Sequence, residues 1–167
     1  TICRYTDEME ISMNIKKKIL GITIAPVITL GLISMFLTTT MVRSAMLEEI
    51  EEALRGTAAA TLAAYDQNTG DYLQTSNGDI WKGSYNISKS ESLVDRIKGN
   101  TDMDVTFFYG DTRIMTSAVD AGGNRILNSK AGDRIVEKVL QGGESYFSHA
   151  VSIEGTLNYG YFIPVYQ

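Results

Sequence analysis

The sequence predicts an α+β protein in which a transmembrane helix continues into a long helix and then into a small mixed domain. Two observations support this prediction. Residues 19–42 contain no Asp, Glu, Lys or Arg, and about 20 apolar residues are enough to cross a bilayer as a helix. Beyond this stretch, apolar residues recur first at helical spacing and later at the alternating spacing of antiparallel strands.

The charged residues at the two ends of the apolar stretch differ in sign. Lysines Lys16–Lys18 precede it, whereas residues 48–52 are glutamates apart from one isoleucine. Basic residues stay on the cytoplasmic side of a membrane. We therefore expect residues 1–18 to form a cytoplasmic stub, residues 19–42 to span the inner or plasma membrane, and residues 43–167 to lie outside the cytoplasm.

A cleaved secretory signal peptide is the alternative interpretation of the same stretch. Such a peptide has an apolar core of only about 7–15 residues and ends in a small-residue cleavage site. The charge-free stretch is longer than that core, and its end at Thr38–Val42 lacks a clean small-x-small motif. Both features favour a membrane span.

Composition excludes several functional classes. The chain carries 15 basic and 20 acidic residues, for a formal net charge of −5, so we expect no basic surface for nucleic acid. Its single cysteine, Cys3, excludes a disulfide framework and a cysteine-built metal site. We expect no cofactor and no metal ion.

The helix is expected to continue beyond the membrane to about Gln67. Residues spaced by three and four positions share one of its faces: Leu47, Ile50, Leu54, Ala58, Thr61 and Tyr65. Two interpretations of this face are compatible. The face packs on its own domain, or it forms the seam of a homodimer, because Ala and Thr allow a second helix to approach closely.

The remaining elements are short, and residues typical of turns separate them. We expect a short strand within 80–87, a helix at 90–98 ended by Gly99–Asn100, and a helix at 133–141. Strands are expected at 104–109, 113–119, 145–153 and 157–165, with a hairpin tip at 121–124. Alternate residues of the last strand are expected to share one face: Leu157, Tyr159, Tyr161, Ile163 and Val165.

Four segments in this order carry a resemblance to a known family: Asp104–Ser117, Gly123–Ala131, Val139–Phe147 and Tyr159–Tyr166. They resemble the single Cache sensor domain, which is the extracytoplasmic ligand-binding part of methyl-accepting chemotaxis proteins and related receptors. The resemblance covers residues 16–167 and implies a PAS-like antiparallel sheet with short helices. The family's domain continues beyond the strand that holds Pro164, so we expect the sensor domain here to be incomplete at its C-terminus.

The function that the resemblance implies is sensing of a small molecule by a transmembrane chemoreceptor, with a helix displacement that crosses the membrane. The same type of sensor also serves histidine kinases and cyclic-dinucleotide enzymes, so these remain alternatives for the output.

The resemblance also implies a ligand pocket between the sheet and the segments covering one of its faces, with small carboxylates and amino acids among the common ligands. A carboxylate matches the planar, permanently charged fork of arginine. Arg113 is the first candidate because it lies in a predicted strand; its alternatives are a solvated strand face and a salt bridge with Asp111. The other candidate contacts are Arg125, Lys130, Phe107, Tyr109, Tyr159, Tyr161 and Trp81.

Core packing is the alternative for the aromatic candidates, and it is favoured for Phe107. Trp81 and Tyr85 are expected to belong to a loop that covers the pocket.

Enzymatic chemistry has little support, and we expect no catalytic residue. Ser148 is next to the only histidine, His149, but neighbours along a strand point to opposite faces. A membrane-tethered extracytoplasmic enzyme, dependent on His149, is the competing hypothesis. The segment Gly142–Gly143–Glu144 superficially resembles a diguanylate cyclase signature, but a turn that ends a helix explains its glycines.

Overall fold

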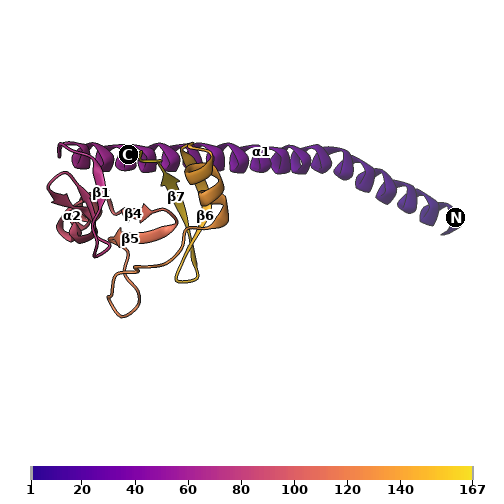
Figure 1. Cartoon of the computed structure of the whole chain (residues 1–167). Helices are drawn as coiled ribbons and strands as arrows, with labels where there is room; N and C mark the ends of the chain where they lie inside the picture. The colour runs from indigo at the N-terminus through magenta and orange to yellow at the C-terminus, as the bar shows by residue number, and fades with distance from the viewer. Residues whose placement is uncertain (1, 167) are drawn as a thin grey trace. The chain divides into compact units, whose positions relative to one another are not determined.

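The computed structural model describes the backbone of residues 2–166 and the side chains of residues 15 and 17–166. It confirms the α+β class, with a long N-terminal helix followed by small antiparallel sheets and short helices (Figure 1). The chain divides into two compact units, Thr1–Leu47 and Glu48–Gln167. Helix α1 (Ile2–Asp66) begins in the first unit and ends in the second.

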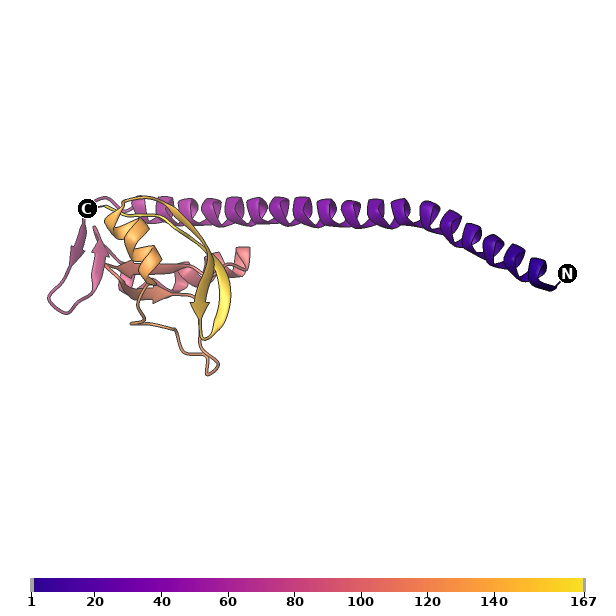
Figure 2. The same cartoon turned by 90° about the vertical axis from the view of Figure 1, so that its right-hand side faces the viewer.

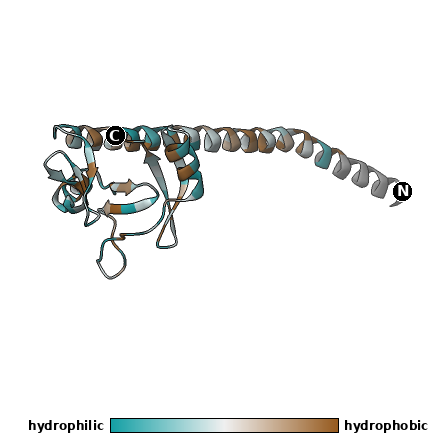
Figure 3. Cartoon of the chain, viewed as in Figure 1, coloured by the Kyte–Doolittle hydropathy of each residue, from teal (hydrophilic) through white to brown (hydrophobic). Residues whose placement is uncertain are grey.

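Within the first unit, α1 is exposed and strongly apolar along the stretch that follows the lysines (Figure 3). From Lys17 onwards it is long and apolar enough to cross a membrane. The hydroxyl groups of Thr23, Thr29 and Thr39 donate hydrogen bonds to carbonyl oxygens one turn earlier in the same helix. Such bonds satisfy polar side chains where no water is present.

In the second unit, the last turn of α1 supplies the centre of the main core. Tyr65 is fully buried and packs with Ile80 and Ile87. Its ring contacts those of Tyr85 and Phe107 edge-on, at centroid distances of 5.6 and 4.5 Å. The predicted continuation of the helix to about Gln67 is confirmed, because α1 ends at Asp66.

After α1, the chain forms a small antiparallel sheet of three strands: β1 (Tyr72–Gln74), β2 (Ile80–Lys82) and β3 (Tyr85–Asn86). The strand expected within 80–87 is therefore two strands joined by a tight turn. Strand β1 was not predicted from the sequence, because its three residues lie among turn-forming residues and bury little surface. Figures 1 and 2 show this sheet next to the end of α1.

Two glycines allow the backbone to approach itself closely in this sheet. Gly83 has a φ of +55°, and a Cβ atom on it would overlap the carbonyl oxygen of Thr69. On the other side of the contact, a Cβ on Gly70 would lie 2.8 Å from the Cα of Gly83. Only glycine fits both the conformation and the space here.

The variant Gly83→Ala is expected to lower the free energy of unfolding by about 2–3 kcal/mol, because a left-handed residue and a steric overlap are each costly. Gly78→Ala is the matched control: Gly78 also has a positive φ, +90°, but has no atom within 4 Å of the added Cβ. It should cost only about 1 kcal/mol. Chemical denaturation of the two variants measures the difference, and equal losses would contradict the close approach.

The chain then enters η1 (Ile87–Lys89) and α2 (Glu91–Thr101). Helix α2 runs through Gly99 and Asn100, which were expected to end it. It ends before Asp102, which has the left-handed conformation. The prediction of a stop at Gly99 was wrong because glycine only weakens a helix interior. The backbone bond from Asp102 N–H to the Lys98 carbonyl at 2.8 Å closes the last turn instead.

Strands β4 (Thr106–Tyr109) and β5 (Thr112–Thr116) form an antiparallel pair with a β-bulge. A second buried cluster lies against this pair and consists of Val94 of α2, Val105 just before β4, and Met115 of β5. Both strands were predicted, and both are shorter than expected. After β5, the bridge between Val119 and Arg125 confirms the chain reversal predicted at 121–124.

The last elements are a helical turn, α3 (Asp133–Ile135), which continues as the π-helical η2 (Val136–Gln141), and the ribbon of β6 (Tyr146–Ile153) and β7 (Thr156–Phe162). A helix was predicted at 133–141, and the structure forms it as α3 followed by η2. Strand β7 ends before Pro164 rather than at Val165. Of the residues expected to share one face, Leu157, Tyr159 and Tyr161 lie in β7, whereas Ile163 and Val165 lie beyond its end.

Candidate functional site

The β-bulge in β5 determines where Arg113 points. Phe107 pairs with Met115, whereas the next residue, Phe108, pairs with Arg113, so Ile114 is the extra residue. In a regular strand Arg113 and Met115 would share a face. The bulge instead leaves Ile114 and Met115 in the two core clusters and turns Arg113 to the other face of the pair.

On that face, Arg113 is buried, and none of the described side chains supplies a carboxylate partner. The residue is 6% exposed, and its guanidinium lies over the Phe108 ring, 5.5 Å from the ring centroid. Its Nη1 is 3.5 Å from the carbonyl oxygen of Ile126. The Nε is buried and has no hydrogen-bond partner within residues 2–166. Buried charges in proteins are normally paired, so this arginine stands out.

Burial dominates the electrostatics of this arginine. Desolvation lowers the pKa of the Arg113 guanidinium below its ordinary value, and the charge of Asp104 opposes that shift. Asp104 pairs with Lys98 rather than with Arg113: its Oδ1 accepts hydrogen bonds from Lys98 and Ser117, both at 2.8 Å. An anion that reached Arg113 would relieve its desolvation cost.

A second unpartnered polar group lies next to Arg113. The segment 126–130 runs along β5, where the Arg113 N–H donates to the Ser129 carbonyl oxygen and the Asn128 N–H donates to the Arg113 carbonyl oxygen, both at 2.9 Å. The Ser129 Oγ is buried and lacks a partner among the described residues. Sequence reasoning missed Ser129 because no pattern indicated that this irregular segment would lie beside β5.

Aromatic rings lie on the same side of the pair as Arg113. Phe108 contacts Phe162 of β7 at a centroid distance of 6.4 Å. The rings of Phe108 and Phe162 and the guanidinium of Arg113 therefore come from three separate strands. Phe108 was not among the predicted contacts, because the bulge that aligns it with Arg113 leaves no mark in the sequence.

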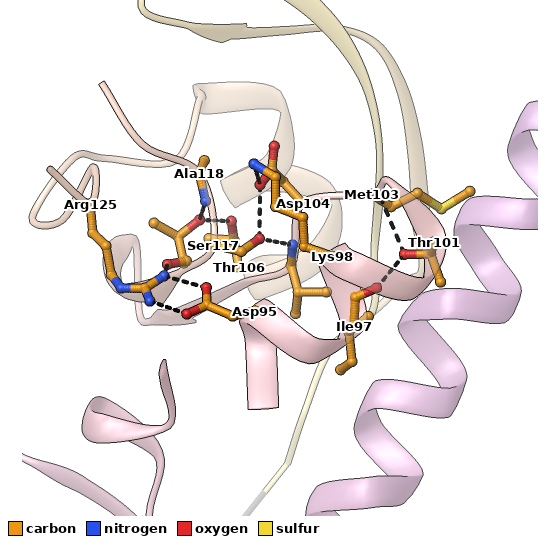
Figure 4. A network of polar contacts seen from close by, with 12 residues as sticks. Asp95, Ile97, Lys98, Thr101, Met103, Asp104, Thr106, Ser117, Ala118 and Arg125 are labelled. Atoms are coloured by element: carbon orange, nitrogen blue, oxygen red, sulfur yellow. Dashed lines mark hydrogen bonds and ion pairs between the residues drawn. The ribbon is translucent and has the colours of Figure 1, made fainter. Parts of the chain in front are cut away.

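Arg125, a second predicted contact, is held by protein groups (Figure 4). Its guanidinium donates to both carboxylate oxygens of Asp95, at 2.9 and 2.6 Å, and to the Thr116 carbonyl oxygen at 2.7 Å. This bidentate pair joins α2 to the segment after β5. In Figure 4 the Lys98–Asp104–Ser117 contacts connect α2 to the residues before β4 and after β5.

The ion pair predicts a pH dependence. Hydrogen bonding from Arg125 lowers the pKa of Asp95. A depressed folded-state pKa stabilises the fold fully above the unfolded-state value of about 3.9, and this stabilisation is lost as the pH falls through the folded-state pKa. The melting temperature of Asp95→Asn should therefore lie below that of the parent at about pH 7, and the gap should shrink at about pH 3.

Glu91→Gln is the control for this experiment, because the Glu91 carboxylate lies farther from the Arg125 guanidinium, at 3.8 Å. Its gap from the parent should be smaller at both pH values. A gap for Asp95→Asn that stays constant between the two would contradict the role assigned to the pair.

Lys130, the third predicted cation, is exposed and bonds to Asp111 Oδ1 at 2.6 Å and to Thr112 Oγ1 at 2.7 Å. The salt bridge considered between Arg113 and Asp111 is therefore formed by Lys130 instead. Asp111 has a lowered pKa, chiefly because of the hydrogen bond from Lys130. The structure thus brings Arg113 and Lys130 to neighbouring backbone positions but leaves only Arg113 buried and unpaired.

The predicted aromatic walls are dispersed. Phe107 belongs to the core around Tyr65, on the face opposite Arg113. Tyr109 is 42% exposed at the end of β4. Trp81 lies in the separate β1–β2–β3 sheet. Their roles as ligand contacts remain predictions, and for Phe107 the geometry favours core packing.

Strands β6 and β7 place Tyr159 in an aromatic cluster, with its ring centroid 6.0 Å from those of Phe147 and His149. Tyr161 is the backbone partner of Phe147 across the ribbon. Ser148 is buried and His149 is exposed, and no hydrogen bond joins them within the described chain. The same part of the chain contains no group of three residues suited to hold a metal ion.

An apolar groove of about 300 Å³ lies between α1 and α2 in the second unit. Small residues of α1 form one wall and Leu93 and Ile97 of α2 contribute to the other. The small residues include Gly56, Ala60 and Ala64, spaced by four and therefore on one side of the helix.

Comparison with known families gives a match over the second part of the chain. Residues 85–167 match the family model described as single cache domain 3. Neither the search of curated proteins nor the search of solved structures found a match. The matched segment includes Arg113, Phe108 and Ser129.

Proposed function

We propose, from the single Cache domain found at residues 85–167, that this chain is the ligand-sensing module of a bacterial transmembrane chemoreceptor. Single Cache domains are typical extracytoplasmic sensors of small molecules and bind ligands rather than catalyse reactions. The observation that supports a particular residue as the ligand contact is the buried guanidinium of Arg113, whose Nε has no partner among the described residues. Arg113 would contact an anionic group of the ligand, a carboxylate or the carboxylate of an amino acid.

A thermal-shift screen of the full chain in detergent micelles tests the proposal. Amino acids, organic acids, amines and sugars are each added well above their expected dissociation constants. A ligand at 100 times its dissociation constant stabilises the folded state by about 2.7 kcal/mol, so a true ligand should raise the melting temperature by several degrees. Failure of every class of compound to do so would contradict a sensor of small molecules.

The output is proposed to be chemotaxis, with a histidine kinase or a cyclic-dinucleotide enzyme as the alternative. Sequencing of the gene downstream of the codon for Gln167 separates them. A second membrane helix followed by a long heptad coiled coil would support a chemoreceptor, and a catalytic domain would support the alternatives.

The signal is proposed to pass through a homodimer whose seam is α1. The groove lined by Gly56, Ala60 and Ala64 supports this part of the proposal, because small residues let helices approach closely. In a chain with Cys3→Ser, the substitution Ala60→Cys should give a disulfide-linked dimer on mild oxidation. The same substitution at exposed Ser76 is the control, and a monomer in both cases would contradict the seam.

The membrane part of the proposal places residues 19–42 across the bilayer with the N-terminus in the cytoplasm. It is supported by the apolar, exposed surface of α1 and by the lysines that precede that surface. The domain that contains Arg113 would then meet ligands outside the cytoplasm.

A further inference from the structure

The surroundings of Arg113 narrow the class of ligand beyond a carboxylate or an amino acid. We propose that the ligand is a small monocarboxylate without an ammonium group, held by the free edge of Arg113 and by the hydroxyl group of Ser129. This inference rests on the sensor function proposed above. It adds Ser129 as a second contact residue and excludes ligands that carry an ammonium group.

The first step identifies which nitrogen atoms of the Arg113 guanidinium are free to donate to a ligand. Its Nη1 already faces the Ile126 carbonyl oxygen at 3.5 Å, whereas Nε is buried without a partner. Among the residues whose side chains are described, Nη2 donates no hydrogen bond either. The Nε and Nη2 donors form one edge of the guanidinium plane, and this edge pairs with the two oxygens of a planar carboxylate.

The second step is the hydroxyl group of Ser129. Its Oγ is buried and unpartnered, and the Ser129 carbonyl oxygen accepts the Arg113 N–H at 2.9 Å. Arg113 and Ser129, each with an unsatisfied buried polar atom, are thus neighbours across a backbone hydrogen bond. Buried polar atoms without partners are rare in folded proteins. A carboxylate that accepts from both residues satisfies both atoms at once.

The third step excludes an ammonium group. Asp104 is the one carboxylate whose charge affects the Arg113 pKa, and it is bonded to Lys98 at 2.8 Å. Asp111 is bonded to Lys130 at 2.6 Å. An ammonium group beside Arg113 would lie next to a like charge, and the charges of Asp104 and Asp111 are each already paired with a lysine. A simple carboxylate would instead neutralise the buried guanidinium.

The apolar part of the ligand has a surface to pack on. The ring of Phe108 lies beneath the guanidinium, and Phe162 lies 6.4 Å from Phe108 between ring centroids. These rings offer hydrocarbon contact but no hydrogen-bond acceptor, so they favour an aliphatic or aromatic tail over a second charged group.

Calorimetric titration of the full chain in detergent micelles tests the inference. The probes are straight-chain carboxylates from acetate to hexanoate and 3-phenylpropionate, the α-amino acid that matches each acid, and inorganic phosphate. The best carboxylate should bind at least about tenfold more tightly than its amino acid and more tightly than phosphate. Ser129→Ala should weaken binding of that carboxylate by at least about tenfold, the loss of one hydrogen bond to a charged group. The control Ser76→Ala, in an exposed turn, should leave its affinity unchanged.

Three results would overturn the inference while leaving the sensor function intact. They are amino acids that bind as tightly as their matched carboxylates, phosphate or another class of compound that binds more tightly, and a Ser129→Ala variant with the parent's affinity. Absence of binding by these probes and by every compound of the thermal-shift screen would overturn the proposed function itself.

Discussion

Arg113→Met is expected to make the ligand-free chain more stable while abolishing its response to ligand. Removing a buried guanidinium with an unpartnered Nε removes a desolvation cost of about 1–3 kcal/mol, and a methionine fills a similar space with a flexible apolar side chain. The melting temperature of the unliganded variant should therefore rise. In the presence of any ligand that stabilises the parent, the variant should show no further rise.

The opposite behaviour is expected of Arg125→Met. Arg125 is bonded to Asp95 at 2.6 Å and to the Thr116 carbonyl oxygen at 2.7 Å, so its loss leaves two acceptors without their donor. This variant should melt below the parent and retain the shift caused by ligand. If Arg113→Met instead lowered stability and preserved the response, Arg113 would be a structural residue and its assignment as a ligand contact would be wrong.

The largest loss of stability is expected for Tyr65→Ala. Tyr65 is fully buried, contacts two other aromatic rings, and donates from its hydroxyl group to Ser90 Oγ at 2.5 Å. Truncating a buried aromatic residue to alanine costs about 3–5 kcal/mol, a large part of the about 5–15 kcal/mol that stabilises a typical domain. Chemical denaturation should show a folded fraction that is reduced or lost.

Tyr65→Phe separates the ring from the hydroxyl group. It keeps the packing, and Ser90 Oγ still donates to the Ile87 carbonyl oxygen at 2.7 Å, so the expected loss is only about 1 kcal/mol. A loss as large as that of the alanine variant would show that the hydrogen bond, rather than the aromatic core, anchors the end of α1.

Tyr65→Phe should also differ from the parent in how its stability changes at alkaline pH. Burial raises the pKa of Tyr65 to about 12. Because this folded-state value lies above the unfolded value of about 10, the stabilisation is complete below about pH 10 and is lost as the pH rises towards about 12. Tyr65→Phe should lose less stability over this interval than the parent. Part of the loss should remain, because burial also raises the pKa of Tyr72 to about 12.

Much of the fold was predictable because its elements follow local patterns. The apolar stretch, the stripe that ends at Tyr65, and the strands around Phe107 and Arg113 all have the periodicity of the element that they form. The prediction was wrong where tertiary contacts override local preference. Helix α2 continues through Gly99 because Val94 and Ile97 pack in a buried cluster that fixes the helix.

The site was predictable only in part. A cation in a strand marked Arg113 as unusual, and its burial confirms that it is not on a solvated face. Its neighbours could not be found in the same way. Phe108 aligns with Arg113 only because of the bulge at Ile114, and Ser129 reaches β5 through backbone hydrogen bonds of an irregular segment. Neither feature produces a periodic pattern in the sequence.

A sensor of molecules outside the cytoplasm must expose its domain on that side of the membrane. Labelling of intact cells with a membrane-impermeant maleimide tests this directly, because Cys3 is the single cysteine of the chain. A Cys3→Ser, Ser76→Cys chain places the thiol in an exposed turn of the second unit and should be labelled without lysis. The parent chain, with Cys3 alone, should be labelled only after the cells are made permeable. The reverse pattern would contradict an extracytoplasmic sensor.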